Sequence, residues 1–160
     1  AVGETLKEEL EAKGYNVIHL KEYNDSQGMD RAYNNSNETV KKFLENYERK
    51  IDIIIDLHRD SYEKEILNKD DPAQIMFVIG TGYDEWEDSL KLAIKTQKEA
   101  DKKYPNLFKP ITVSDRVFNQ NLANNALLIE VGEENNSLEK AKESVRCFAD
   151  ALDSAIKQAD

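Results

Sequence analysis

The sequence is poor in the residue types that build many metal and redox sites. Its 160 residues include one cysteine, Cys147, and two histidines, His19 and His58. A single cysteine excludes an intrachain disulfide and any zinc site built from several cysteines. Cys147 lies in a helical pattern without an activating neighbour, which favours a thiol packed on a helix face over a catalytic thiol.

Long apolar runs and clusters of basic residues are also missing. No stretch reaches the roughly 18 apolar residues of a membrane span, and no signal peptide is recognisable. The formal net charge is −10, the pI is about 4.8, and the Lys and Arg residues form no block. Nucleic acids and anionic lipid surfaces bind clustered positive charge, so the composition argues against both as partners. The chain starts at Ala1 without a methionine, and we expect a processed piece from which a leader or anchor has been removed.

The length suits one domain, so residues 1–160 are interpreted as a single domain. Apolar periodicity predicts helices over residues 2–14, 35–50, 86–104 and 138–156, and strands over 15–20, 51–57, 75–79, 111–113 and 126–132. Loops are expected at 21–35 and 60–73. This alternation predicts an α/β fold with three layers, in which helices flank a mainly parallel sheet. Because the chain opens with a helix and then a strand, the strand that normally comes before this helix is missing.

Two helix starts carry the pattern of a capping box, an Asn followed three residues later by a Glu. The first pairs Asn35 with Glu38, and the second pairs Asn136 with Glu139. At the other end of a helix, Gly14 is placed to end the first one.

The most informative stretch is the run from Ile51 to Leu57, which is followed by His58. A nearly unbroken apolar run of this length is typical of a strand buried on both faces of a parallel sheet. Ionisable side chains follow at the end of this strand. In open α/β sheets, ligands and catalytic groups lie at this end of the strands. We therefore interpret His58 as a metal ligand at the carboxyl end of this strand.

A second buried strand carries a carboxylate, Glu130, within the sequence Leu-Leu-Ile-Glu-Val. Burying a carboxylate is costly unless its charge is compensated. A metal, a catalytic role, or a salt bridge with Arg59 or Arg116 would each meet this requirement. For the other histidine, His19, a hydrogen bond near a strand end is the favoured interpretation, with a ligand role as the alternative.

These residues alone do not define a metal site. A catalytic zinc ion is typically held by three protein ligands and keeps one position open for water. Glu130 could be a ligand, or a base that takes a proton from the attacking water. The chain has no HExxH helix and only two histidines.

Five blocks of sequence together resemble the stage II sporulation protein P family. In chain order they are Ile55-Asp-Leu-His-Arg-Asp60, Ile75-Met-Phe-Val-Ile-Gly-Thr81, Tyr104-Pro-Asn-Leu-Phe-Lys-Pro110, Phe118-Asn-Gln120 and Leu127-Leu-Ile-Glu-Val-Gly132. They keep the order of the family and cover nearly the whole chain. The family is similar to the zinc-dependent N-acetylmuramoyl-L-alanine amidases of the third amidase class, whose fold is a twisted sheet flanked by helices.

The resemblance implies hydrolysis of the amide between N-acetylmuramic acid and the L-alanine of the stem peptide in peptidoglycan. It also implies a role in engulfment during sporulation, cleavage of peptide cross-links, and action together with stage II sporulation protein D. His58 matches a zinc ligand of the family, and Glu130 matches its general base. One zinc ion is expected, with further ligands upstream of Ala1, and no substrate-binding residue is assigned. The location expected is extracytoplasmic, in the cell wall or intermembrane space of a sporulating bacterium, with a membrane-anchored parent protein.

The chain departs from the family in three ways. The His-Thr-His motif and glutamate that supply the first ligands at a strand end are absent. The family carries arginines where this chain has Asn35 and Asn37, and a second glycine where it has Glu133. Two alternatives therefore stay open. One is a non-catalytic peptidoglycan-binding module of the same fold, and the other is an acidic interaction domain in which His58 and Glu130 join a salt-bridge network.

Overall fold

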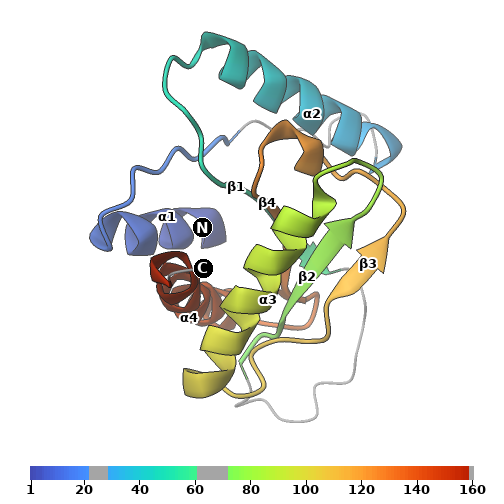
Figure 1. Ribbon diagram of the computed structural model, residues 1–160. Coiled ribbons are helices and arrows are strands. Elements are labelled where there is room, and N and C mark those ends of the chain that lie inside the picture. Colours follow the sequence, from blue (N-terminus) through green and yellow to red (C-terminus); the bar gives the residue numbers. More distant parts are fainter. Residues whose placement is uncertain (22–28, 61–71, 159–160) are drawn as a thin grey trace.

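The computed structural model describes residues 1–21, 29–60 and 72–158, with the backbone alone for residues 29–34. Four α-helices and four strands make up the described part, in an order that Figure 1 shows. None of the described helices has the length and apolar character needed to cross a membrane. The helices are α1 (Val2–Ala12), α2 (Met29–Asn46), α3 (Trp86–Lys103) and α4 (Leu138–Lys157), and the strands are β1 (Ile54–Asp60), β2 (Ile75–Gly80), β3 (Thr112–Ser114) and β4 (Ala126–Glu133), with a short 3₁₀ helix η1 (Gln120–Leu122).

The four strands form one mixed sheet in the order β1-β4-β2-β3. The pairs β1–β4 and β2–β3 are parallel, and the central pair β2–β4 is antiparallel. The predicted α/β class with a mainly parallel sheet and flanking helices is confirmed. Strand β4 is an interior strand, and all but one of its residues are buried.

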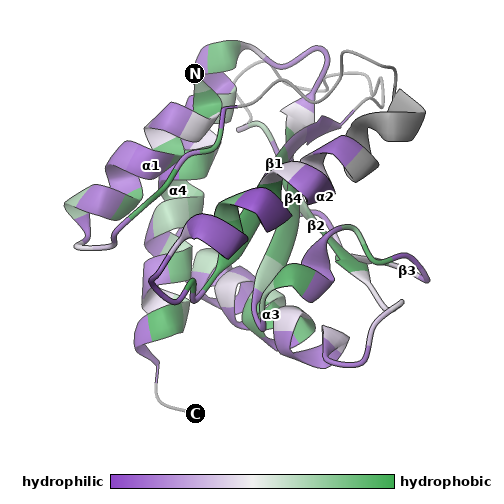
Figure 2. Cartoon of the chain, turned by 90° about the horizontal axis from the view of Figure 1, so that it is seen from above, coloured by the Kyte–Doolittle hydropathy of each residue, from purple (hydrophilic) through white to green (hydrophobic). Residues whose placement is uncertain are grey.

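The hydrophobic core lies between one face of this sheet and helices α1, α3 and α4. Hydrophobic residues gather on the strands and on the inner sides of the helices, as Figure 2 shows. Phe77 on β2 stacks on Phe108 with ring centroids 4.9 Å apart and meets Phe148 of α4 edge-on at 6.2 Å. Large buried rings contribute much of the hydrophobic stabilisation of a core of this size.

Several predicted elements agree with the structure. Helix α1 ends where Gly14 adopts a left-handed φ of 95°, and α3 and α4 follow the predicted ranges within one or two residues. The short strand predicted at 111–113 is β3, shifted by one residue.

Other predictions about secondary structure were wrong. Residues 15–20 form no strand within the described part, although Tyr15, Val17 and His19 are half-buried while Asn16 and Ile18 are exposed. Their apolar alternation suits a strand, but a strand also needs a hydrogen-bonded neighbour. The predicted loop 21–35 is already helical from Met29 onward, while residues 22–28, like residues 61–71 of the loop 60–73, lie outside the described residues.

Both predicted capping boxes were also misplaced. Asn35 lies inside α2, which begins at Met29 and ends at Asn46 instead of near Lys50. Helix α4 is capped by Ser137, whose hydroxyl accepts a hydrogen bond from the Lys140 amide. An Asn with a Glu three residues later also fits the polar side of a helix, so this pattern alone does not locate the first turn.

The carboxylate of Asp150 on α4 connects three elements through ionic hydrogen bonds. It accepts from the Tyr104 hydroxyl at 2.9 Å, from Lys103 Nζ at 3.0 Å and from Lys13 Nζ at 3.3 Å. Lys103 and Tyr104 thereby lower the pKa of Asp150 from 3.8 to about 2. Desolvation together with the hydrogen bond to Asp150 raises the pKa of Tyr104 to about 12.

Replacing this carboxylate should destabilise the fold in a pH-dependent way. The folded pKa of Asp150 is lower than its unfolded value, so its stabilisation is present above about pH 4 and is lost as the pH falls toward about 2. We expect Asp150→Asn to lower the unfolding free energy by about 1 kcal/mol at pH 7, as measured by urea denaturation, and the difference to shrink below pH 4. Asp88→Asn is the control, because the carboxylate of Asp88 pairs with an exposed lysine on its own helix. Equal effects of both substitutions would contradict the account.

Candidate functional site

The parallel pairing of β1 with β4 brings the two predicted site residues together. In this register His58 lies directly opposite Glu130. Side chains alternate between the faces of a sheet, so Asp56, His58 and Glu130 share the face opposite the main core. The sequence predicted that the ends of these two strands meet, and the structure places the two residues on the same face as neighbours.

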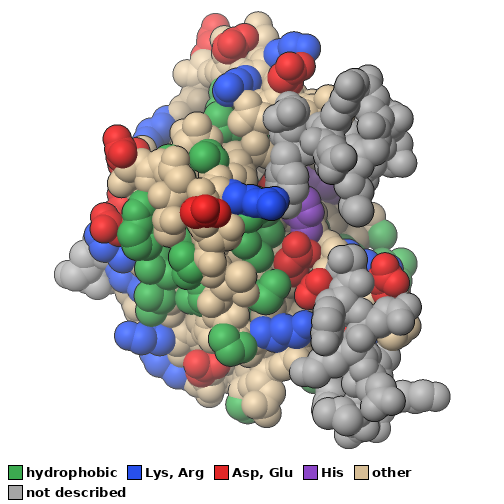
Figure 3. Space-filling model, turned by 90° about the vertical axis from the view of Figure 1, so that its right-hand side faces the viewer, with side chains coloured by type: hydrophobic (Ala, Val, Ile, Leu, Met, Phe, Trp, Pro, Cys, Tyr) green, Lys and Arg blue, Asp and Glu red, His purple; other side chains and the backbone are tan. Residues whose placement is uncertain are grey.

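The imidazole of His58 is oriented by a carboxylate two residues earlier on the same strand. His58 Nε2 lies 3.0 Å from Asp56 Oδ1, and the two side chains are 35% and 27% exposed. A carboxylate in this position selects the tautomer of the ring and fixes its direction. Figure 3 shows a histidine with acidic and basic side chains around it on one face of the molecule.

Glu130 is the most unusual group of the site. Its Oε2 atom is buried and has no hydrogen-bond partner among the described residues. Burial raises the pKa of the Glu130 carboxyl, the carboxylates of Asp60 and Asp56 add to this shift, and His58 and Lys109 oppose it. A carboxyl group held in this way binds a proton more readily than an exposed one, which is a property of catalytic bases.

A salt bridge of Glu130 with Arg59 or Arg116, one of the alternatives that the sequence left open, is not formed within the described part of the chain. Arg59 instead donates to three backbone carbonyls, those of Glu133, Glu134 and Asn136, at 2.6–3.1 Å. Arg116 is exposed. Thus neither arginine forms an ion pair with Glu130 among the described residues.

Lys109 is a part of the site region that the sequence did not reveal. Its Nζ lies 2.6 Å from Glu133 Oε1 and 3.7 Å from Asp60 Oδ2, so it bridges the ends of β4 and β1. The backbone amide of Lys109 donates to the carbonyl of Ile75, which holds this residue beside β2. Only the three-dimensional structure brings this lysine to the strand ends, because its neighbours in sequence form a loop.

The residues where the chain departs from the family that it resembles also have defined contacts. Asn37 donates to Asn119 Oδ1 at 2.9 Å, and Asn119 donates to Ser36 Oγ at 2.8 Å. These bonds attach α2, which also contains Asn35, to the loop before η1. Glu133 is held by Lys109 as described above.

Buried Gln120 fixes the same loop to the sheet. Its side-chain amide donates to the Val78 carbonyl at 2.7 Å and accepts from the Gly80 amide at 2.8 Å, so it bonds to the backbone of β2 as a neighbouring strand would. Gly80 is required here, since a Cβ atom at this position would lie 2.2 Å from the Arg116 carbonyl oxygen.

The described residues supply only part of a zinc-binding site. They contain no group of three or more His, Cys, Asp or Glu side chains arranged to hold a metal. His58 can supply one ring nitrogen as a metal ligand. The buried Oε2 atom of Glu130, which lacks a hydrogen-bond partner among the described residues, could accept a hydrogen bond from a nearby group or bind a cation. His19 is committed elsewhere, because its Nδ1 lies 3.2 Å from Glu4 Oε2 and its ring packs on Gly3. A catalytic zinc site would therefore need ligands from outside the described residues.

The raised pKa of Glu130 predicts the effect of removing its charge. For a carboxyl whose folded pKa is raised, stability is fully present below the unfolded value of 4.5 and is lost as the pH rises through the folded pKa. We therefore expect Glu130→Gln to raise the unfolding free energy by about 1 kcal/mol at pH 7, and the gain to vanish below pH 4.

This prediction is tested by urea denaturation in the presence of a chelator, so that bound metal does not contribute. Glu133→Gln is the matched control and should instead destabilise the protein, because it weakens the ion pair with Lys109. A loss of stability in Glu130→Gln at pH 7 would mean that a cation already compensates this carboxylate.

The chain is similar to proteins of one known family. The family model described as stage II sporulation protein P matches residues 1–153. The curated stage II sporulation protein P of Bacillus subtilis (strain 168) is 30% identical over 166 residues, which cover 94% of this chain and 41% of that protein. The chain thus spans about two fifths of the length of this relative.

Among solved structures, the CwlD amidase from Clostridioides difficile, determined in complex with the GerS lipoprotein, has a similar fold. The TM-score is 0.61 and the sequence identity is 16%, over 96% of this chain and 80% of the amidase chain. At this identity the likeness shows the fold alone. Since the family model covers nearly the whole chain, the chain belongs to the stage II sporulation protein P family.

Proposed function

We propose that the chain is the catalytic region of a zinc-dependent N-acetylmuramoyl-L-alanine amidase that acts on peptidoglycan during sporulation. The observation that carries this proposal is the pairing of His58 with Glu130 across β1 and β4, where one oxygen of Glu130 is buried without a partner. Membership of the sporulation family and the amidase-like fold support the same reaction class.

In the proposed reaction, the residues of this chain orient a metal ligand and transfer a proton. When bound, zinc supplies Lewis-acid activation of water and of the amide carbonyl. His58 would hold the ion, with its ring oriented by Asp56. Glu130 takes a proton from the attacking water while the water oxygen bonds to the carbonyl carbon of the amide. It returns the proton to the nitrogen of L-alanine as the carbon–nitrogen bond breaks.

The remaining features of the proposal concern the whole protein. Its substrate would be the amide between N-acetylmuramic acid and L-alanine, with cutting of peptide cross-links as a second activity. Peptidoglycan lies outside the cytoplasmic membrane, so the protein would act there during engulfment, beside stage II sporulation protein D. The further zinc ligands would come from the polypeptide upstream of Ala1.

A second candidate function is a non-catalytic peptidoglycan-binding module of the same fold. It is favoured by one observation, the lack of a three-ligand metal group within the described residues. The two candidates differ in the metal content and hydrolytic activity of the full-length protein.

The role of Glu130 as base is tested by Glu130→Gln in the full-length protein. The glutamine keeps the shape of the side chain and cannot accept the proton, so hydrolysis of purified sacculi should fall by about 10²-fold or more while zinc content and fold are retained. Release of new L-alanine amino termini measures the reaction. Glu139→Gln, an exposed change at the start of α4, should leave the rate unchanged. Cleavage by Glu130→Gln at the parent rate would refute the assignment.

The role of His58 as ligand is tested by metal analysis of the purified full-length protein. We expect about one zinc per chain in the parent protein and much less in His58→Ala, because one nitrogen donor is lost. His19→Ala should retain zinc, since His19 is paired with Glu4 on α1. A parent protein that lacks both zinc and hydrolysis of muropeptides would instead support the non-catalytic module.

A further inference from the structure

A β-bulge in β4 turns a second carboxylate toward the face that carries Glu130. On β1, His58 and Asp60 are two residues apart, while their partners on β4 are three residues apart, since Asp60 pairs with Glu133. Gly132 lies within this bulge and has a left-handed φ of 69°. Side chains alternate between the two faces of a strand, so without the bulge Glu133 would point toward the core. With the bulge, Glu133 shares the face of Glu130 and Asp60.

Lys109 reaches this face from the other side of Glu130. Phe108 forms a parallel bridge with Ile75 of β2, so Lys109 is the neighbour of Met76. Met76 in turn lies directly opposite Glu130 on β4. Residues that are neighbours on adjacent strands point to the same face of a sheet. The side chain of Lys109 therefore begins beside β2 on the face of Glu130 and extends from there toward β4 and β1.

Two carboxylates on this face share the ammonium group of Lys109. Its Nζ atom lies 2.6 Å from Glu133 Oε1 and 3.7 Å from Asp60 Oδ2. The side chains of Lys109, Glu133 and Asp60 are only 19%, 12% and 21% exposed. Ion pairs that are partly removed from water are screened less than those on an open surface. The closer partner, Glu133, thus determines where the ammonium group lies.

Glu130 lies beside this cluster and forms no ion pair with it. Burial raises the pKa of Glu130, and the charge of Lys109 opposes this rise, so the ammonium group already acts on the carboxylate. The buried Oε2 atom of Glu130 has no hydrogen-bond partner among the described residues. A lysine ammonium carries several donors on a flexible stem, so rotation of the stem redirects it. If Glu133 lost its charge, Glu130 would be the acceptor that gains most from the lysine.

We propose that Glu133 is a positioning residue that holds Lys109 away from Glu130. The ion pair with Glu133, supported by Asp60, keeps the ammonium group at the strand ends, and Glu130 stays free of a lysine partner. Pairing with a cation stabilises a carboxylate and makes it a weaker base. The consequence for catalysis rests on the proposed function, whereas the position of Lys109 does not.

The proposal predicts that the effect of removing the Glu130 charge changes sign when Glu133 is neutral. In the parent protein, Glu130→Gln should raise the midpoint of urea denaturation at pH 7, because an incompletely compensated carboxylate is removed. In a Glu133→Gln background, Lys109 pairs with Glu130, so Glu130→Gln should lower the midpoint by breaking this ion pair. The measurement is made with a chelator present and needs no hydrolysis. A rise of the midpoint in both backgrounds would overturn the proposal.

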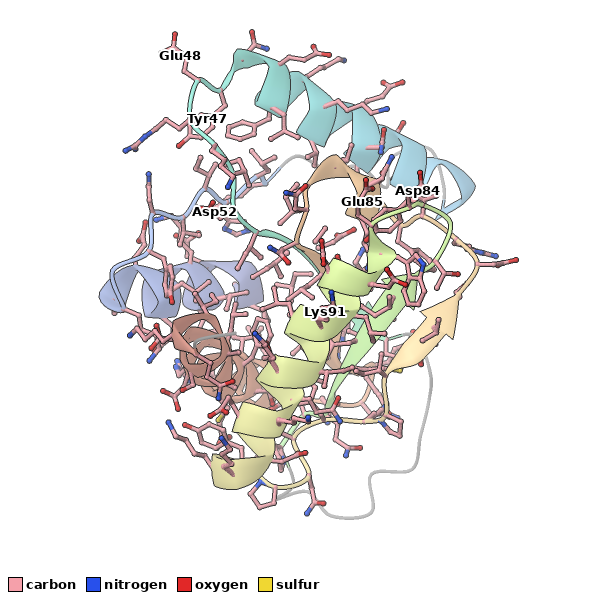
Figure 4. All side chains as sticks on the ribbon, in the orientation of Figure 1. Tyr47, Glu48, Asp52, Asp84, Glu85 and Lys91 are labelled. Carbon is pink, nitrogen blue, oxygen red and sulfur yellow. The ribbon has the colours of Figure 1, made fainter. Side chains whose placement is uncertain are left out.

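Removal of the lysine tests whether Lys109 causes this reversal. When Lys109→Met is added to the Glu133→Gln background, Glu130→Gln should raise the midpoint again. Lys91→Met is the matched control, because Lys91 lies on α3 in the helix layer on the other side of the sheet, as labelled in Figure 4. With Lys91→Met in place of Lys109→Met, the midpoint should still fall. A fall in the Lys109→Met background as well would overturn the proposal.

Hydrolysis of purified sacculi by the full-length protein tests the consequence for catalysis. Glu133→Gln should lower the rate by about tenfold or more while zinc content is retained. Adding Lys109→Met should restore the rate, which a merely structural role of Glu133 would not allow. A parental rate in Glu133→Gln, or no recovery in the double variant, would overturn the catalytic consequence. A parent protein without hydrolysis would contradict the proposed function, and the change of sign in stability would still decide the position of Lys109.

Discussion

The arrangement of the site depends on the parallel hydrogen bonding of β1 with β4. This ladder sets His58 opposite Glu130, and one carboxylate oxygen of Glu130 is buried away from water. The cost of desolvation raises the pKa of Glu130, and the imidazole across the ladder compensates only part of it. A carboxyl group in this condition is poised to exchange a proton. The backbone register and the burial of one strand therefore produce the chemical property on which the proposed reaction rests.

The surrounding contacts hold the strand ends in place and leave Glu130 without a cation of its own. Arg59 donates to three backbone carbonyls at the end of β4 and in the turn that follows it. Lys109 is occupied by Glu133 and Asp60. Both cations thus stabilise the loop beside the site, and neither forms an ion pair with Glu130. A partly buried carboxylate whose charge is incompletely compensated costs stability, and proteins retain costs of this kind mainly at functional sites.

The fold class, the main helices and the meeting of His58 with Glu130 could be predicted from sequence, because local periodicity and parallel strand ends determine them. The partners of the cations could not, since Arg59 and Lys109 reach groups that are distant in the chain. The strand predicted at residues 15–20 and the interior position predicted for β1 failed together. Both segments carry a strand pattern, and the partner that each requires is absent from the described residues. These failures mark the place where the described sheet is open.

The central claim is that His58 and Glu130 form the two halves of a hydrolytic zinc site. It is tested most directly by an anomalous-scattering crystal structure of the full-length protein with bound zinc. The account predicts zinc about 2.0–2.1 Å from a ring nitrogen of His58, with a Glu130 oxygen within hydrogen-bond distance of the water on the metal. Zinc bound away from His58, or a Glu130 side chain ion-paired to an arginine or lysine in that structure, would contradict it.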